Sequence, residues 1–312
     1  MSPAATRRKA AEPNAVAEQR IEVRKTYKLY IGGAFPRSES GRTYEVRDSH
    51  DRFLANAAMG SRKDARDAVV TARGAFGKWA TATAYNLGQV LYRVAELMEG
   101  RRAQFAAEVA AVEGLTHARA DKVVSRAIDR WVWYAGWSDK LAQVLGGVNP
   151  VAGPYFNISA PEPTGVVAAL APQRSSLLGL VSVLAPIVVS GNTAVVLTSE
   201  HRPLPAVTLS EVLATSDVPA GVINLITGRT AEVAPWLASH QDVNAIDLAG
   251  AADADGLKWG DLELSAAENL KRVLRPAGNA AEAIEPDWSP TPDLSRMKAY
   301  LETKTVWHPK GH

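Results

Sequence analysis

Apolar residues recur at helical spacing between residues 61 and 145. They fall three and four positions apart from Ala65 to Phe76, and again from Leu87 to Met98. This period predicts a block of amphipathic helices, each with one buried face. The aromatic residues of 131–137, Trp-Val-Trp-Tyr-Ala-Gly-Trp, follow the same spacing. We interpret them as core packing against a neighbouring layer rather than as a platform on which a cofactor or base would stack.

Short apolar runs alternate with helical segments from residue 164 onward. The strands are expected at Val166–Ala171, Ala194–Leu197, Val222–Ile226 and Ala245–Leu248, and the helices between them at Leu177–Val189, Leu204–Ala214 and Ala231–Ser239. Short buried strands joined by helices of this length imply right-handed crossovers. We therefore expect an α/β fold with a doubly wound parallel sheet, which usually binds a nucleotide at the carboxyl ends of its strands.

Segments outside this alternation are predicted to be extended or irregular. Lys28–Phe35 alternates and ends in glycines, as a strand that runs into a turn would. Residues 146–163 are rich in glycine and proline and suit an extended arm or hairpin.

The alternation stops after Gly250. One helix is expected at Ala266–Val273, followed by a proline-rich, acidic connector at Ala280–Pro292 that is too polar for a packed core. Charged residues then alternate with less polar ones, so Met297–Trp307 is predicted to be a strand.

Composition indicates a folded globular protein, with 312 residues, 46% hydrophobic and 22% charged. The 35 basic residues are balanced by 33 acidic ones, so the chain builds no field that would hold nucleic acid. Cysteine is absent, which excludes disulfides, thiolate metal sites and a cysteine nucleophile.

Neither a membrane nor a metal site is predicted. No run approaches the roughly 18 apolar residues that would span a bilayer. Residues 1–24 carry basic side chains without a following apolar segment, so we expect no secretory signal and a cytoplasmic location. The histidines show no metal-ligand spacing: His240 and Asp242 lie beside a strand entry, and His308 and His312 lie on a terminal tail.

Specific motifs carry a resemblance to a known family over most of the chain. They are Tyr30-Ile-Gly-Gly-Ala-Phe, Glu162-Pro-Thr-Gly-Val-Val-Ala-Ala-Leu-Ala-Pro, Leu184-Ala-Pro, Gly191-Asn, Ser199-Glu, Val218-Pro-Ala-Gly-Val-Ile-Asn-Leu-Ile-Thr-Gly and Tyr300-Leu-Glu-Thr-Lys-Thr-Val-Trp. On these residues the chain resembles the aldehyde dehydrogenase family, NAD(P)-dependent oxidoreductases that form oligomers. The motifs between residues 162 and 228 look like that family's NAD-binding half, and Tyr300–Trp307 is similar to its terminal strand.

The resemblance divides the chain into six parts. They are a disordered tail at 1–25, the helical part of an NAD-binding domain at 26–145, an oligomerisation arm at 146–163, a doubly wound NAD-binding-like domain at 164–279, a linker at 280–296 and a C-terminal oligomerisation strand at 297–312. Between Gly278 and Met297, where the family places its catalytic domain, this chain has only a short bridge.

The family's catalytic side chains are missing from the matching positions. No cysteine is present to attack the aldehyde. The oxyanion-binding asparagine of a Pro-Trp-Asn-Phe-Pro motif is replaced by Arg174 in Pro-Gln-Arg-Ser-Ser. The general base of a Glu-Leu-Gly-Gly motif is replaced by Pro276, which cannot accept a proton. The resemblance therefore implies a pseudoenzyme without catalytic residues.

The cofactor-binding positions are altered as well. Leu197 stands where the family has a ribose-binding lysine, and only Gly250 remains of a Phe-Thr-Gly-Ser turn. Asp253 and Asp255 follow that turn and would repel a nearby pyrophosphate. Vestigial positions for an adenosine end are Ser199, Glu200, Gly228 and Gly250. We expect no NAD binding or weak NAD binding.

Three functions follow from these observations. The preferred one is a non-catalytic structural or regulatory subunit that joins a full-length aldehyde dehydrogenase through Tyr300–Trp307. The alternatives are an NAD(P)-dependent oxidoreductase acting on aldehydes, and a residual NAD-binding module or decaying gene product. A substitute nucleophile, Ser175 or Ser176 with His201 or His240, is less favoured because serines before a helix are more often N-caps.

Overall fold

The computed structural model describes residues 25–278 and 283–311. The tail expected at 1–25 lies outside the described residues except for Lys25, as do His312 and residues 279–282, where the predicted domain 164–279 meets the predicted linker 280–296.

A five-stranded parallel sheet forms the centre of the molecule, in the order β10-β9-β6-β7-β8. Its strands are β6 (Val166–Leu170), β7 (Thr193–Leu197), β8 (Ile223–Ile226), β9 (Ala245–Asp247) and β10 (Arg272–Leu274). Every residue of the four strands from β6 to β9 is buried, as expected of a sheet covered on both faces. The predicted doubly wound α/β fold is confirmed.

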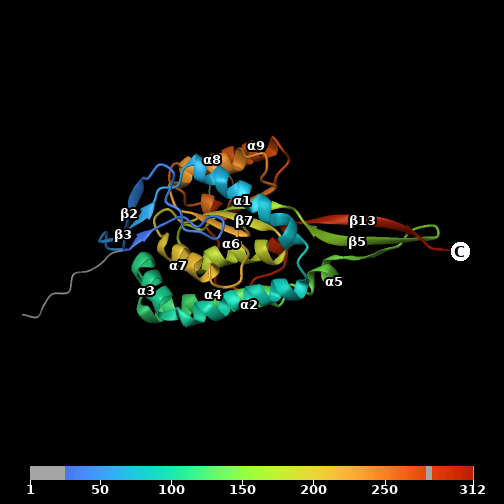
Figure 1. The fold of residues 1–312 in the computed structure, drawn as a ribbon, viewed down its shortest axis with the longest axis horizontal. Helices are drawn as coiled ribbons and strands as arrows, with labels where there is room; N and C mark the ends of the chain where they lie inside the picture. Colours follow the sequence, from blue (N-terminus) through green and yellow to red (C-terminus); the bar gives the residue numbers. More distant parts are fainter. Residues whose placement is uncertain (1–24, 279–282, 312) are drawn as a thin grey trace, which may run out of the picture.

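Helices cover the two faces of this sheet (Figure 1), and the buried side chains on the two faces form two core clusters. One face carries α1 (Arg62–Ala80), α8 (Thr230–Ser239) and α9 (Trp259–Ala267). The other carries α6 (Leu178–Val189) and α7 (Leu204–Leu213), with α2 (Ala84–Gly100), α3 (Arg102–Glu113) and α4 (His117–Ala135) packed outside them. All twelve residues of α6 are buried because it lies between the sheet and this outer layer.

The predicted helical block is confirmed in α1 to α4, and local sequence explains where its helices begin. Ser61 and Asp64 form a reciprocal capping box at the start of α1, and Thr83 and Thr116 cap α2 and α4. Trp131 is fully buried in the larger core cluster, as its interpretation as core packing required.

The prediction that the alternation stops after Gly250 is wrong. The short 3₁₀ helix η1 (Ala249–Ala251) is followed by α9, and Arg272–Leu274 form the edge strand β10 instead of the end of a helix. Leu270 has a φ of 58° after the helix, which stops it from continuing. The edge position explains the weak signal, since Arg272 is exposed and the strand lacks a continuous apolar run.

The connector after this strand is packed more closely than its polarity predicted. β11 (Ala277–Gly278) and β12 (Ala283–Ile284) form a two-stranded antiparallel pair. Trp288 is only 8% exposed and belongs to the larger core cluster, so the prediction of a fully unpacked connector is wrong.

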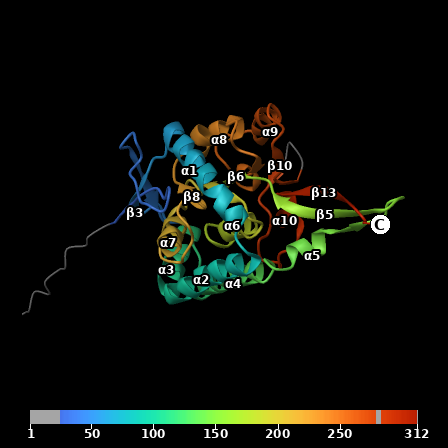
Figure 2. The same ribbon diagram turned by 45° about the vertical axis from the view of Figure 1, so that its right-hand side comes forward.

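The arm at 146–163 and the C-terminal strand form a separate antiparallel sheet in the order β13-β5-β4. Its strands are β4 (Gly147–Asn149), β5 (Tyr155–Pro163) and β13 (Leu301–Pro309), and α5 (Leu141–Leu145) precedes them. Figures 1 and 2 show β5 and β13 projecting away from the central sheet. The final strand begins at Leu301 rather than Met297, because Ser295–Ala299 form the short helix α10.

The segment at Lys28–Phe35 is not the regular strand that was predicted. The paired strand is β1 (Thr26–Tyr27), in a sheet with β3 (Phe53–Ala58) and β2 (Thr43–Arg47). Beyond it, Tyr30 makes a single bridge to Leu225, and the chain turns at Gly32 and Gly33.

Candidate nucleotide site at the edge of the sheet

The sheet order reverses between β6 and β9, because the chain proceeds from β6 towards β8 on one side and from β9 to β10 on the other. Ligands of doubly wound folds bind outside the carboxyl ends of the strands at such a point. In this sheet, the loops at that point are residues 171–176, which follow β6, and residues 248–255, which follow β9. They contain Arg174, Gly250, Asp253 and Asp255, so the topology brings four of the predicted site residues to one edge.

Gly250 lies against the end of β6. A Cβ added to it would lie 2.0 Å from the backbone oxygen of Ala171 and 2.6 Å from that of Leu170. No side chain fits there without a backbone shift. Gly250 is therefore required by the packing of η1 on β6, whether or not a cofactor binds.

Arg174 is engaged on three sides at this edge. Its guanidinium pairs with the Asp253 carboxylate, and its carbonyl oxygen accepts a hydrogen bond from Arg202. Its backbone N–H donates to the Glu285 carboxylate at 2.8 Å, and the next N–H, of Ser175, donates to the other oxygen of Glu285 at 3.0 Å. An acidic side chain from the connector thus occupies the N–H groups before α6, which would otherwise attract an anion.

The two aspartates after Gly250 differ in their surroundings. Asp253 is paired with Arg174, so its charge is compensated within the chain. Asp255 is 80% exposed at its side chain and lies 3.1 Å from His201 Nε2. Of the two aspartates, Asp255 is therefore the one whose carboxylate faces solvent.

The serines before α6 do not form a nucleophile–base pair in the described structure. Ser175 Oγ accepts a hydrogen bond from the N–H of Gly179 at 2.9 Å, as a helix cap does. Ser176 Oγ donates to the Glu113 carboxylate at 2.6 Å, and burial raises the pKa of Glu113. His201 contacts Asp255 instead of either serine.

His240 is likewise occupied elsewhere. Its Nδ1 accepts from the N–H of Asp242 at 3.2 Å, and burial lowers its pKa. No hydrogen bond among the described residues joins it to Ser175 or Ser176.

Ser199 and Glu200, predicted to hold an adenosine end, make internal contacts. Glu200 is only 5% exposed, and its two oxygens accept from Arg229 and from the N–H of Thr230 at 2.9 Å. Ser199 Oγ donates to the carbonyl of Gln173 at 3.0 Å. Glu200 therefore connects the loop after β7 with the start of α8, and Ser199 connects that loop with the loop after β6.

The remaining predicted positions are also accounted for by packing. Gly228 has a φ of 150°, and a Cβ there would lie 3.0 Å from the backbone nitrogen of Gly60. Leu197 ends β7 and is buried, and Pro276 is buried between β10 and β11. None of these three supplies a hydrogen-bonding side chain to the edge.

Sequence reasoning missed four residues that shape this edge, namely Glu113, Arg202, Arg229 and Glu285. Each contacts a loop that is distant in sequence: Glu285 and Ser175 differ by 110 in residue number, and Glu113 and Ser176 by 63. Only Arg229 had a local signal, because it directly follows Gly228.

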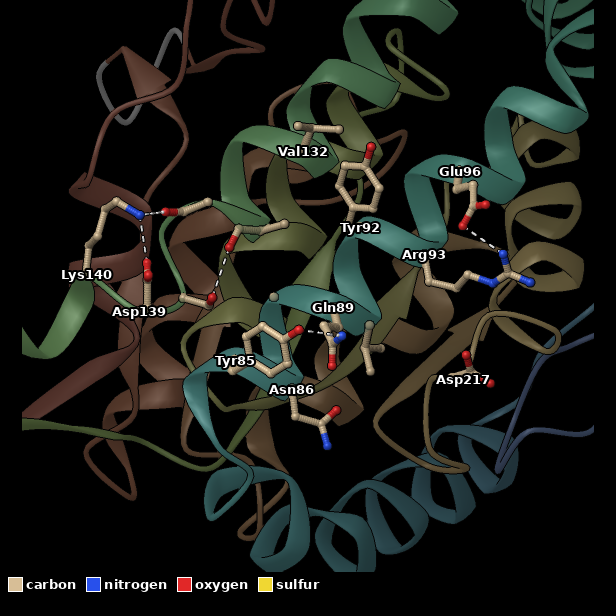
Figure 3. Close-up of a pocket in the computed structure, with 15 residues that line it drawn as sticks. Tyr85, Asn86, Gln89, Tyr92, Arg93, Glu96, Val132, Asp139, Lys140 and Asp217 are labelled. Atoms are coloured by element: carbon tan, nitrogen blue, oxygen red, sulfur yellow. Dashed lines mark hydrogen bonds and ion pairs between the residues drawn. The ribbon is translucent and has the colours of Figure 1, made fainter.

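Other candidate sites in residues 25–278 and 283–311 are few. No cluster of three potential metal ligands occurs there, and no helix there is long and apolar enough to cross a membrane. A cavity of about 770 Å³ opens between α2 and α4, away from the edge of the sheet (Figure 3). Its polar side chains largely pair with one another, as Gln89 does with Tyr85 and Arg93 with Glu96.

Comparisons with known proteins agree with this fold. Residues 35–288 match the pattern of the aldehyde dehydrogenase family. The putative aldehyde dehydrogenase DhaS of Bacillus subtilis is 32% identical over 271 residues, which are 84% of this chain and 52% of that protein. The mitochondrial benzaldehyde dehydrogenase of Antirrhinum majus is 30% identical over 261 residues, 82% of this chain and 48% of that protein.

A solved structure supports the same relationship. The NAD⁺ complex of an aldehyde dehydrogenase from Bacillus cereus matches with a TM-score of 0.73 and 26% identity, over 80% of this chain and 50% of that one. The chain spans about half the length of these relatives. On its fold and on the match over residues 35–288, this protein belongs to the aldehyde dehydrogenase family.

Proposed function

We propose that this chain is an aldehyde dehydrogenase pseudoenzyme, a non-catalytic structural or regulatory subunit of a complex with a full-length aldehyde dehydrogenase. The observation that carries the proposal is the absence of any cysteine from all 312 residues, because the family's reaction requires a thiolate nucleophile. The proline at position 276, where the family has its general base, supports the same conclusion.

The surroundings of the candidate nucleotide site support weak NAD binding or none. Glu200 is held by Arg229 and Thr230, and Glu285 covers the N–H groups before α6. A cofactor would have to displace these contacts, each of which contributes about 1–3 kcal/mol when a charged group takes part. The residues present do not fit NAD as a tightly held cofactor.

Assembly is supported by the edge strand β13. Among the described residues it pairs only with β5, on one side, and eight of its nine residues are exposed. Exposed apolar side chains lie on the same sheet, including Val148, Ile158 and Val306 in one cross-strand row. A long, exposed edge with apolar neighbours favours pairing with a strand of another chain.

The segment that can pair with a strand of a partner chain begins one residue later than the predicted segment, Tyr300–Trp307. Tyr300 is fully buried and precedes the strand, so the part that can reach a partner is Leu301–Pro309.

The register identifies which backbone groups of β13 face outward. Thr303 lies opposite Pro161, which has no N–H, so this pair cannot exchange two backbone hydrogen bonds. The N–H of Thr303 therefore points away from β5, towards the free edge. Proline at this position removes an outward donor and leaves the pairing with β5 intact.

Co-expression with candidate full-length aldehyde dehydrogenases, followed by native mass spectrometry, tests the assembly. We expect a mixed complex with the wild-type chain and with the matched control Thr303→Val, and loss of that complex with Thr303→Pro. This mode of assembly is contradicted if the chain forms no mixed complex with any candidate, or if Thr303→Pro leaves the mixed complex intact. NADH formation at 340 nm with a panel of aldehydes tests the absence of catalysis separately.

A further inference from the structure

Arg130 is a buried arginine without an acidic partner. It lies on α4, is 6% exposed, and donates through its two terminal nitrogens to Ser182 Oγ and to the carbonyl of Pro290. Its Nε is buried and has no hydrogen-bond partner within residues 25–278 and 283–311. Among the described residues, no carboxylate forms an ion pair with it.

An uncompensated charge in this position is costly. Removing a guanidinium from water without a counter-charge costs several kcal/mol, and an arginine avoids that cost only by acquiring an anion, because it does not deprotonate in proteins. Burial lowers the pKa of Arg130, and the nearby cations Arg126 and Arg296 lower it further. The electrostatic surroundings of Arg130 therefore favour a bound negative charge.

A cavity of about 150 Å³ adjoins this guanidinium, between α4, α6 and the connector 287–296. That volume is about ten times the space that one water molecule needs. Trp288 lines the same cavity and is 8% exposed, and its Nε1 is also buried without a partner in the part of the chain that the structure describes. Tyr134 lines it as well, and burial raises the pKa of its hydroxyl to about 12, so the hydroxyl keeps its proton at neutral pH.

The other charged groups around the cavity are either paired or at its rim. Arg296 is bonded to Asp247 and lies 4.9 Å from the ring of Trp288. Asp287 and Asp293 are exposed, and their carboxylates accept the N–H groups of nearby serines at 2.8 and 2.9 Å. These acids weaken the attraction for an anion through screened solvent, but they do not neutralise the buried Arg130.

We propose that this cavity binds a small oxyanion, an inorganic phosphate or sulfate or the phosphoryl group of a small metabolite, held by Arg130 and by the Nε1 of Trp288. The guanidinium presents N–H donors in the planar arrangement that suits two oxygens of such an ion. The site lies against the connector, so the bound anion fastens residues 288–290 to α4 and α6. It does not depend on catalysis or on NAD.

Titration of the full chain with sodium phosphate and sodium sulfate tests the site, with sodium chloride at the same ionic strength as the reference. Calorimetry and the unfolding temperature are the two measurements. We expect the oxyanions to bind and to raise the unfolding temperature beyond the effect of chloride. Equal effects of phosphate, sulfate and chloride would overturn the proposal.

Variants locate the site. Arg130→Gln is expected to weaken phosphate binding tenfold or more. Arg126→Gln removes an exposed arginine one turn away on the same helix, outside the cavity, and is expected to keep binding within about twofold. Full binding by Arg130→Gln contradicts the assignment. If that variant does not fold, Trp288→Phe, which removes one donor, should still weaken binding severalfold, and unchanged binding there contradicts it equally.

A second ligand distinguishes the two sources of the oxyanion. Binding of phosphate but not of glycerol 3-phosphate identifies an inorganic ion enclosed by the cavity. Binding of both identifies a site for a phosphoryl group with its substituent at the rim beside Asp287 and Asp293.

Discussion

The hydroxyl of Tyr300 donates a hydrogen bond of 2.6 Å to the carboxylate of Asp247, and neither residue is exposed to solvent. Arg296 donates to the same carboxylate, whose other oxygen accepts the N–H of Ala249 at 2.9 Å. Asp247 ends β9, so this cluster joins the start of the projecting strand β13 to the central sheet across 53 residues of sequence.

Removing this hydroxyl should destabilise the protein. Tyr300→Phe leaves a buried carboxylate with one donor fewer, which costs about 1–3 kcal/mol in the free energy of unfolding. Urea denaturation checks the value. The control is Tyr92→Phe, at an exposed position on α2, where a change within about 0.5 kcal/mol is expected. Equal stabilities of the two variants would show that the cluster does not fasten the strand.

Glu108 should make stability depend on pH. Burial raises the pKa of Glu108 from 4.5 to about 7, against the hydrogen bonds that it accepts from Thr208, Gln104 and Tyr27. Because the folded pKa is the higher one, this group's contribution is fully present below pH 4.5 and is lost as the pH rises through 7.

The size of the effect is at most about 3 kcal/mol, at 1.36 kcal/mol per pKa unit. Wild type should therefore lose stability relative to Glu108→Gln between pH 5 and pH 8, in urea unfolding at both pH values. The control is Glu96→Gln, at an exposed position, which should differ from wild type by the same free energy of unfolding at pH 5 and at pH 8. A Glu108→Gln curve parallel to the wild-type curve would contradict the prediction.

Gly250 should not tolerate a side chain even without a cofactor. Gly250→Ala places a Cβ 2.0 Å from the backbone oxygen of Ala171, and the backbone shift that this forces costs about 1–3 kcal/mol or more. Gly77→Ala is the matched control, since nothing lies within 4 Å of its added Cβ and it sits inside α1. That control should gain about 0.5–1 kcal/mol from helix propensity. Thermal unfolding in the absence of NAD gives both values.

Glu200 should stabilise the protein by itself. Glu200→Gln removes the charge that holds Arg229 and weakens the bond to the N–H of Thr230, at a cost of about 1–3 kcal/mol. Glu162→Gln, which removes an exposed ion pair with Lys304, should change stability by less than about 1 kcal/mol. If Glu200→Gln is as stable as wild type without NAD, the carboxylate is not a structural group, and a cofactor role for it gains support.

The parts of the fold that are buried on both faces could be predicted from sequence. Continuous apolar runs such as those of β6 and α6 follow directly from that burial. β10 was missed because an edge strand with an exposed Arg272 has no such run. The first residues of the final strand were misassigned because Ser295–Ala299 form the short helix α10, and Tyr300 is buried and bonded to Asp247 before the strand begins.

From the sequence, the candidate site could be predicted only as a set of positions at which the residues of the family's motifs are replaced. Arg174 and Pro276 can be identified from motifs that adjoin them in sequence. Their surroundings cannot, because the Arg174–Asp253 pair spans 79 residues and the Glu285–Ser175 bond spans 110. No local pattern records which of several acidic residues will meet a given loop.

The sequence by itself determined that this protein has a doubly wound α/β core and no cysteine nucleophile, because strand and helix periods and the absence of a residue type are local properties of the chain. The tertiary structure alone decided which charges are compensated. It pairs Asp253 with Arg174, covers the start of α6 with Glu285, and buries Arg130 beside a cavity without an ion pair to an acid among the described residues. Electrostatic energies depend on distance and burial in three dimensions, which residues far apart in the chain acquire only on folding.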